Sequence, residues 1–193
     1  MTLKRLIAVD GLDGSGKNTH ASSIKTLIER NGEIVVIRSH PSTGRLGRAS
    51  KNALQREGHV ARFLATIFFT LDVLFSVRWY NKKADCTVIF VRYILGTAYL
   101  PRRLAPHGYR LFRNMLPFPD LALFIDIDPE IAIRRIEERD HTREMFETKE
   151  KLDKVRQTVG KLIGEEWTVV DNSENGEQPF RRIEAILGER GFI

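Results

Sequence analysis

Residues 5–19 read RLIAVDGLDGSGKNT, and this stretch decides the fold. Residues 5–10 form a short apolar run of the kind that makes a buried strand. A glycine-rich segment follows, and residues 19–30 then carry apolar side chains at helical spacing. The order of strand, glycine-rich loop and helix predicts a loop whose backbone N–H groups point inward beside the start of a helix.

Within that loop, residues 11–17 match the phosphate-binding pattern G-x-x-x-x-G-K. Glycines let the backbone curl around phosphates, and the Lys17 ammonium can follow the bridging and terminal phosphates. Asn18 replaces the usual Ser or Thr that binds Mg²⁺, although its amide oxygen can still contact the metal directly or through water. We therefore expect a triphosphate to be held by Gly11, Asp13, Gly14, Ser15, Gly16, Lys17, Asn18 and Thr19.

The rest of the chain continues to alternate between short apolar runs and helical patterns. Further strands are expected at 33–38, 87–91, 121–126 and 167–171. Helices are expected at 60–79, from 129 to about 139, from about 147 to 163, and from 179 onward. Continuously apolar strands separated by helices predict an α/β fold with three layers, in which helices cover both faces of a parallel sheet of about five strands. No internal repeat or linker interrupts it, so a single domain is expected over 1–193.

The composition is that of an ordinary globular protein, with 42% hydrophobic and 29% charged residues in a chain of 193. No apolar stretch approaches the roughly 20 residues needed to span a bilayer, and the first residues lack the order of a signal peptide. Cys86 is the single cysteine and cannot form an internal disulfide. These features favour a cytoplasmic protein. The histidines show no metal-ligand spacing, so no zinc site is expected.

The net charge of +6 indicates an affinity for anions. Basic residues recur in three separate places, at 38–56, 102–113 and 134–156. That scatter fits several phosphate contacts around a cleft at least as well as a stripe that binds nucleic acid. We expect nucleotide substrates, with no nucleic acid and no membrane as partners.

A phosphate-binding loop that reads GLDGSGK after a strand ending in Asp10 resembles that of the thymidylate kinase family. Further similarities extend along nearly the whole chain, at Pro41 with Leu46-Gly47, Arg92-Tyr93, Pro119-Asp120-Leu121, Ile125-Asp126, Asp128-Pro129-Glu130 and 139–143. The resemblance implies a P-loop kinase that uses ATP with Mg²⁺ to phosphorylate a nucleoside monophosphate, most closely dTMP to dTDP. It also implies a small lid around 139–147.

The resemblance assigns the acceptor side to Asp13, Pro41, Phe69 and Arg92. Arg92 directly follows an apolar strand, where side chains reach the ligand crevice of an open α/β fold, and would hold the monophosphate. Phe69 would stack on the pyrimidine, although an ordinary core aromatic is an equal alternative on so apolar a helix. Asp13 would contact the sugar hydroxyl or the metal.

Arg135 and Arg139 lie four residues apart on one helix face. In nucleoside monophosphate kinases a similarly spaced pair stacks on adenine and grips phosphate, and Arg143 would join it from the lid. An ordinary solvated helix is the alternative, because acidic residues lie nearby. Positions 12–15 contain no arginine, which in this family resembles the type whose catalytic arginine comes from the lid. The expected catalytic residues are Lys17, Arg92, Arg139 and Arg143.

Several positions depart from the family pattern. Val91 stands where the family has an Asp that helps to hold hydrated Mg²⁺, so Val91 and Asn18 together alter two metal contacts. On the acceptor side, Val73 replaces an arginine, and Ser39-His40 replaces Arg-Glu. These departures leave open a different acceptor, or a nucleotide-binding protein of the same fold with little catalysis. Residues 81–85, NKKAD, resemble the N-K-x-D motif with which GTPases bind guanine. The spacing differs by one residue, so the sequence does not favour a GTPase.

The expected helix 60–79 carries more apolar surface than one core face needs. Members of the family pair through such helices. The sequence therefore predicts a homodimer.

Overall fold

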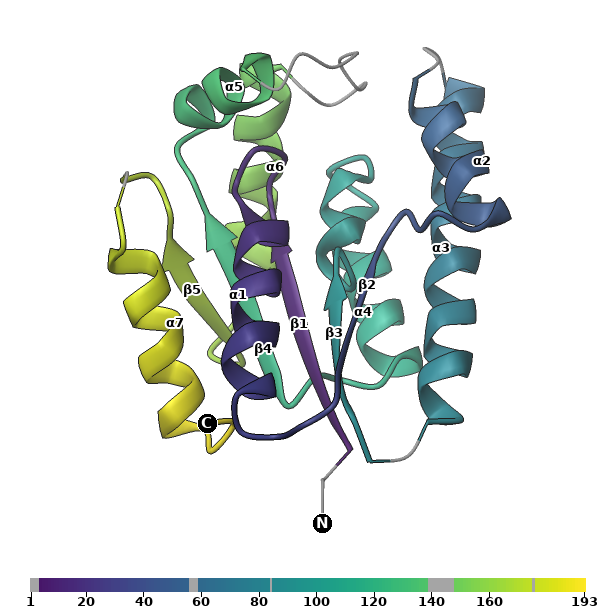
Figure 1. The fold of residues 1–193 in the computed structure, drawn as a ribbon. Coiled ribbons are helices and arrows are strands. Elements are labelled where there is room, and N and C mark those ends of the chain that lie inside the picture. Colours follow the sequence, from purple (N-terminus) through teal and green to yellow (C-terminus); the bar gives the residue numbers. More distant parts are fainter. Residues whose placement is uncertain (1–3, 56–58, 84, 139–147, 175) are drawn as a thin grey trace.

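The computed structural model describes residues 4–55, 59–83, 85–138, 148–174 and 176–193. Its centre is one parallel sheet with the strand order β2-β3-β1-β4-β5 (Figure 1). The five strands are β1 (Arg5–Gly11), β2 (Val35–Ser39), β3 (Thr87–Val91), β4 (Leu121–Asp126) and β5 (Trp167–Asp171). The expectation of a parallel sheet with about five strands is thus confirmed.

Helices cover both faces of the sheet, in three layers as expected. On one face α1 (Lys17–Glu29) and α7 (Gln178–Glu189) pack against apolar residues of the strands, among them Ile7, Ile89 and Leu123. The opposite core contains Val88, Phe90 and Phe124 and lies under three helices, α3 (His59–Asn81), α4 (Ala105–Met115) and α6 (Lys149–Leu162). The remaining helices are α2 (Arg45–Leu54), the 3₁₀ helix η1 (Leu95–Tyr99) and α5 (Pro129–Glu137).

Three of these elements, α2, η1 and α4, were not expected from the sequence. In α2 the buried residues are Gly47, Ser50 and Ala53, which are too small to give an apolar pattern. They are buried because α2 packs closely against α3, where the Ser50 hydroxyl donates to the Ala65 carbonyl at 3.1 Å. Only the tertiary contact distinguishes this helix from a polar loop. The lid expected around 139–147 lies outside the described residues.

Strand β1 is central and pairs with β3 on one side and β4 on the other. In a parallel sheet the carboxyl ends of all strands meet at one edge, and ligands bind where connections leave that edge in opposite directions. Both the glycine-rich loop after β1 and the segment after β3 leave from this edge. The fold therefore brings residues 11–17 and Arg92 to the same side of the molecule.

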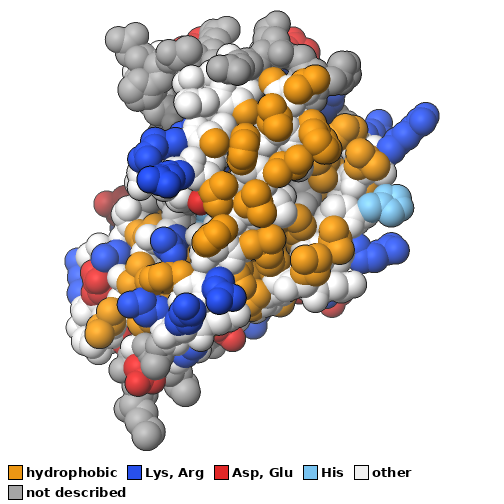
Figure 2. All heavy atoms as spheres, turned by 90° about the vertical axis from the view of Figure 1, so that its right-hand side faces the viewer, with side chains coloured by type: hydrophobic (Ala, Val, Ile, Leu, Met, Phe, Trp, Pro, Cys, Tyr) orange, Lys and Arg blue, Asp and Glu red, His pale blue; other side chains and the backbone are white. Residues whose placement is uncertain are grey.

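Helix α3 presents a broad apolar face to solvent (Figure 2). Its exposed apolar residues are Val60, Phe63, Leu64, Ile67, Leu71 and Phe75. Among the described residues, α3 is one helix that by length and composition could cross a membrane, over Phe63–Asn81, with 33% of that window buried. A helix that covers a sheet can have the same length and composition, so this is weak evidence for a membrane span. The length of Phe63–Asn81 does show that the expectation of no apolar stretch near the length of a membrane span was wrong.

Asp10, at the end of β1, connects the central strand to the segment after β3. It is 1% exposed, and its carboxylate accepts the Tyr93 N–H at 2.7 Å and the Leu95 N–H at 3.2 Å. Burial raises the pKa of Asp10 from 3.8 to about 6. The two hydrogen bonds from the backbone limit this rise, and so do the positive charges of Lys17 and Arg92.

We predict that Asp10 makes the folded protein less stable as pH rises from about 4 to about 6. In that window the folded chain keeps a proton on Asp10 that the unfolded chain has released, so raising the pH favours unfolding. Two pKa units correspond to at most about 3 kcal/mol. Urea unfolding of wild type and Asp10→Asn at several pH values measures this. Between about pH 4 and about pH 6, the free energy of unfolding of wild type should fall by about 1–3 kcal/mol more than that of the variant. Equal decreases in the two proteins would contradict the prediction.

Gly47 provides a test of the packing between α2 and the preceding turn. A Cβ at Gly47 would lie 2.0 Å from the Ser42 carbonyl oxygen, whereas a Cβ at Gly160, also in a helix, would meet nothing within 4 Å. We expect Gly47→Ala to lower the free energy of unfolding by about 1–3 kcal/mol through overpacking. Gly160→Ala should raise it by about 0.5–1 kcal/mol through helix propensity. Urea unfolding measures both, and a neutral Gly47→Ala would show that the turn has room to move.

Candidate active site

The glycine-rich loop runs from the end of β1 to the first residue of α1. Gly14 and Gly16 have left-handed backbone conformations with φ values of 80° and 81°, which glycine adopts at little cost. A Cβ at Gly14 would also lie 2.6 Å from the carbonyl oxygen of Ala132 in α5. The loop therefore needs glycine for its conformation and for its close approach to α5. The loop joins the end of β1 directly to the N-terminus of α1, which is the arrangement of an anion-binding loop.

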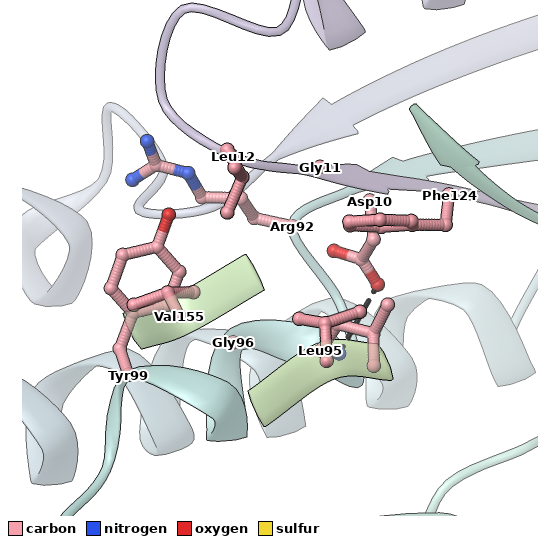
Figure 3. A pocket seen from close by; sticks show the side chains of 10 residues that line it. Asp10, Gly11, Leu12, Arg92, Leu95, Gly96, Tyr99, Phe124 and Val155 are labelled. Atoms are coloured by element: carbon pink, nitrogen blue, oxygen red, sulfur yellow. Dashed lines mark hydrogen bonds between the residues drawn. The ribbon is translucent and has the colours of Figure 1, made fainter. Parts of the chain in front are cut away.

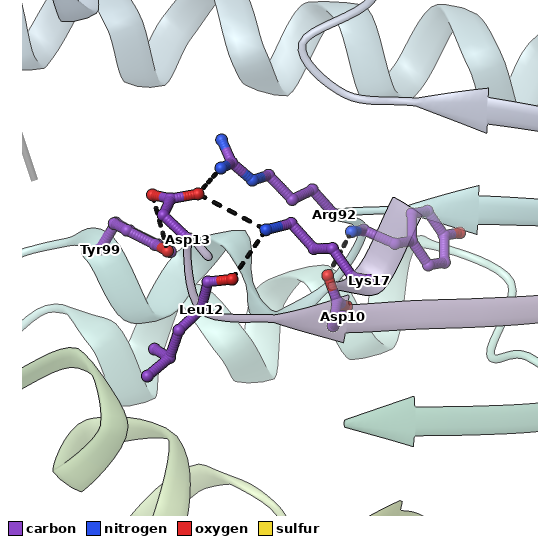
Figure 4. Close-up of polar contacts among 7 residues, drawn as sticks. Asp10, Leu12, Asp13, Lys17, Arg92 and Tyr99 are labelled. Carbon is purple, nitrogen blue, oxygen red and sulfur yellow. Dashed lines mark hydrogen bonds and ion pairs between the residues drawn. The ribbon is translucent and has the colours of Figure 1, made fainter. Parts of the chain in front are cut away.

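Three side chains from separate parts of the chain meet around the carboxylate of Asp13 in this loop (Figure 4). Lys17 donates to the Leu12 carbonyl at 2.8 Å and lies 3.5 Å from Asp13 Oδ1. Arg92 forms an ion pair with the same oxygen, and the Tyr99 hydroxyl donates to Oδ2 at 3.3 Å. Asp13 and Lys17 are only 4% and 6% exposed, so their charges are stable in this position because they are paired.

Arg92 follows β3 in a left-handed conformation with φ of 57°, which is uncommon for a residue other than glycine. Hydrogen bonds hold the backbone on both sides. The Arg92 N–H donates to the Val9 carbonyl at 3.3 Å, and the N–H of the next residue, Tyr93, donates to Asp10. This conformation turns the side chain away from the sheet and toward Asp13 (Figure 4). The Nε–H of Arg92 is buried and has no hydrogen-bond partner among the described residues.

A second group of residues extends the site toward α3. The Phe69 ring packs on Gly96 of η1, where an added Cβ would lie 2.6 Å from its Cζ. The His40 ring lies edge-on to Phe69 with 6.3 Å between centroids. Asp72, three residues after Phe69 on α3, accepts the Ser42 N–H and hydroxyl, both at 2.6 Å. Asp72 thereby fixes the turn that follows the buried Pro41.

A small pocket lies beside the end of β1, with side chains from η1, β4 and α6 around it (Figure 3). Arg92, Tyr99 and Asp10 are its polar lining side chains, and the other side chains of the lining are apolar. Its lining consists of Asp10, Gly11, Leu12, Arg92, Leu95, Gly96, Tyr99, Phe124, Val155 and Val159.

The structure brings the expected site residues Asp13, Lys17 and Arg92 into contact. Phe69 is connected to them through His40, whose ring lies edge-on to Phe69 and whose Nδ1 lies beside the Arg92 carbonyl. Asn18 and Thr19 are exposed at the start of α1, on the same loop. Arg135 lies on α5 and is partly buried, and its charge is close enough to contribute to a lowered pKa of His20, after the larger effect of burial. Arg139 and Arg143 lie outside the described residues.

The donor atoms needed for Mg²⁺ are only partly available. Val91 is 1% exposed and offers no oxygen. Both oxygens of Asp10 accept backbone N–H groups, and both oxygens of Asp13 are engaged with Lys17, Arg92 and Tyr99. Among the described residues no three His, Cys, Asp or Glu side chains are grouped as a metal site. Of the two metal contacts expected from the sequence, Asn18 and Asp13, Asn18 is the one whose side chain is exposed beside the loop.

Sequence reasoning missed the parts played by Tyr99, Asp72 and His40. Tyr99 lies on η1, which was not expected from the sequence, and no spacing connects it to Asp13, 86 residues away. Asp72 offered a signal, because it is a lone acidic residue within the apolar part of α3. A carboxylate in such a position usually has a specific partner.

Comparisons with known proteins identify relatives of this chain. A family model described as "Thymidylate kinase" matches residues 9–183. The chain is 30% identical to the "Probable thymidylate kinase" of Pyrobaculum calidifontis, covering 94% of each protein. It is 28% identical to the "Thymidylate kinase" of Xanthomonas campestris pv. campestris, covering 94% of this chain and 82% of that protein.

A solved structure shares the fold over almost the whole chain. The thymidylate kinase from Candida albicans has a TM-score of 0.74 at 21% identity, covering 98% of this chain and 93% of that one. The solved structure supports the P-loop α/β architecture, and the family match spans both the glycine-rich loop and Arg92. The chain therefore belongs to the thymidylate kinase family.

Proposed function

We propose that this chain transfers the terminal phosphoryl group of ATP to a nucleoside monophosphate, and that the acceptor is dTMP. The observation that carries the proposal is the shared carboxylate of Asp13, which holds Lys17 from the phosphate-binding loop and Arg92 from the segment after β3. Two cations from opposite sides of the crevice thus lie within reach of one anion. The triphosphate of ATP and the phosphate of the acceptor would meet at these two cations, Lys17 and Arg92.

On the donor side, the N–H groups of the glycine-rich loop would bind the β- and γ-phosphates, and Lys17 would neutralise the charge that develops between them. Lys17 now contacts a carbonyl and a carboxylate, so a triphosphate would compete for an ammonium group already aimed at the loop. An oxygen of the acceptor phosphate attacks the γ-phosphorus, the bond to the bridging oxygen breaks, and ADP leaves.

On the acceptor side, Arg92 would bind the monophosphate. Its buried Nε–H lacks a partner among the described residues, and a phosphate oxygen would provide one. Its terminal nitrogen already pairs with Asp13, which orients the guanidinium. Phe69 on α3 packs on Gly96 beside His40 and would stack against the base. Val73 is fully buried in the core, so it stabilises the fold and cannot read the base from the surface.

Mg²⁺ would enter with ATP and take most of its ligands from phosphate oxygens and water. The exposed Asn18 at the start of α1 is the side chain that would contact it, directly or through water. The metal would supply neutralisation of the β- and γ-phosphates. Arg135 would contact the donor nucleotide from α5, and either Arg139 or Arg143 would provide the catalytic arginine from the lid around 139–147.

We also infer that the chain forms a homodimer, because α3 leaves a continuous apolar face uncovered (Figure 2). Phe63 and Phe75 are 65% and 63% exposed on it. Patches of this kind on soluble proteins usually mark contact surfaces, and a second copy of the same helix offers a matching apolar face. A cytoplasmic location and the lack of nucleic acid and membrane partners remain expectations from composition.

ADP release tests the proposed reaction. Purified protein with ATP and Mg²⁺ should release ADP when dTMP is added, faster than with dUMP, UMP or other monophosphates. Lys17→Met should reduce this rate by at least about 100-fold, because it removes a charge from the developing transition state. Lys161→Met, on the exposed face of α6, is the matched control and should keep the wild-type rate. A Lys17→Met variant with full activity, or a wild type inactive on every monophosphate, would refute the proposal.

The dimer is tested by light scattering on wild type and on a Phe63→Glu, Phe75→Glu double variant. Wild type should show twice the mass of the 22.2 kDa chain. The double variant should be monomeric, because burying two carboxylates at the contact is unfavourable. Leu111→Glu, at a 55% exposed site on α4, should stay dimeric. A wild type with the mass of a single chain would rule out the dimer.

A further inference from the structure

His40 connects three elements of the acceptor side. It directly follows β2, is 3% exposed, and its backbone N–H donates to the Val91 carbonyl at 2.9 Å. Its Nδ1 lies 3.0 Å from the carbonyl oxygen of Arg92. Its ring lies edge-on to Phe90 at 5.4 Å and to Phe69 at 6.3 Å between centroids. One imidazole thus touches the residue expected to hold the acceptor phosphate and the ring expected to stack on its base.

The chemistry of this contact determines which nitrogen carries the proton. A carbonyl oxygen can only accept a hydrogen bond, so Nδ1 must be the donor. Burial lowers the pKa of His40, while Asp72 opposes this and Arg38 adds to it. The ring is therefore neutral near pH 7, with its single proton on Nδ1. Nε2 is then a bare acceptor, and it is buried with no partner among the described residues.

The Arg92 backbone is in a conformation that needs such support. A φ of 57° costs a residue with a side chain free energy that surrounding contacts must offset. Asp10 holds the N–H of the next residue, and His40 holds the carbonyl of Arg92 itself. These two contacts lie on either side of the same peptide unit. Together they determine how that unit is oriented, and with it the direction in which the Arg92 side chain leaves the backbone.

We propose that His40 is a positioning residue for the acceptor: its Nδ1–H holds the Arg92 carbonyl and so aims the guanidinium at the acceptor phosphate. The proposal rests on the assignment of Arg92 to the acceptor in the proposed function. An apolar residue of similar size would fill the space beside Phe69 and Phe90 but leave the carbonyl without this donor. The donor at the δ position, and not the volume of the ring, is the required property.

Variants at His40 separate the two properties. Asn has an N–H donor at the same distance from the backbone as Nδ1, whereas Leu fills more of the space and has no donor. Calorimetry should show that His40→Asn binds dTMP within about 3-fold of wild type, while His40→Leu binds it at least about 10-fold more weakly. Both variants should bind ATP like wild type, because Lys17 and the glycine-rich loop are untouched. Urea unfolding of both variants measures their stability and shows whether each one is folded under the conditions of the binding experiment.

Two calorimetric outcomes would overturn the proposal. Equal affinities of the Asn and Leu variants for dTMP would show that the donor does not matter. A Leu variant that loses ATP and dTMP binding in parallel would show a general structural role.

The tautomer of His40 can be read without any substrate. Long-range ¹H–¹⁵N spectra of the wild-type protein near pH 7, assigned with His40→Asn, should show a protonated Nδ1 and a bare Nε2. A protonated Nε2 would overturn the proposal. The ADP assay is run on the same samples, and a wild type inactive on every monophosphate would refute the proposed function while the tautomer still decides the contact between His40 and Arg92.

Discussion

The site depends on the burial of one carboxylate, that of Asp13, between two cations. A buried negative charge is costly unless it is paired, and Lys17 and Arg92 provide the pairing. The three residues come from the phosphate-binding loop, the start of α1 and the end of β3, so the ion pairs also connect these elements. Because the same cations would bind phosphates, the interaction that organises the loop also prepares the site for its substrates.

The acceptor half is organised by hydrogen bonds to backbone groups. Asp10 holds two N–H groups after β3, His40 holds the Arg92 carbonyl, and Asp72 holds the turn after Pro41. Each of these polar side chains is nearly inaccessible to water, where a hydrogen bond is strong and its loss is costly. The arrangement explains how Arg92 keeps its left-handed conformation beside a sheet of ordinary strands.

Helix α3 serves two parts of the molecule. Its inner face places Val73 and Val77 in the core and Asp72 and Phe69 at the acceptor side. Its outer face is apolar and exposed (Figure 2). Since one rigid helix carries both faces, contact with a second copy would also restrain Phe69. A dimer would in this way support the geometry of the site, although its contact surface lies on the outside of the helix.

The sequence by itself determined the parallel five-stranded sheet, the glycine-rich loop and the family, because these depend on local patterns. Apolar runs predict strands, and the spacing of Gly11, Gly14, Gly16 and Lys17 predicts a phosphate-binding loop. Only the tertiary structure showed that α2 and α4 are helices, that Tyr99 contacts Asp13 and that His40 contacts Arg92. Tyr99 and Asp13 are 86 residues apart in the sequence, and His40 and Arg92 are 52 residues apart. No periodic pattern in a sequence records which distant polar groups pair once they are buried.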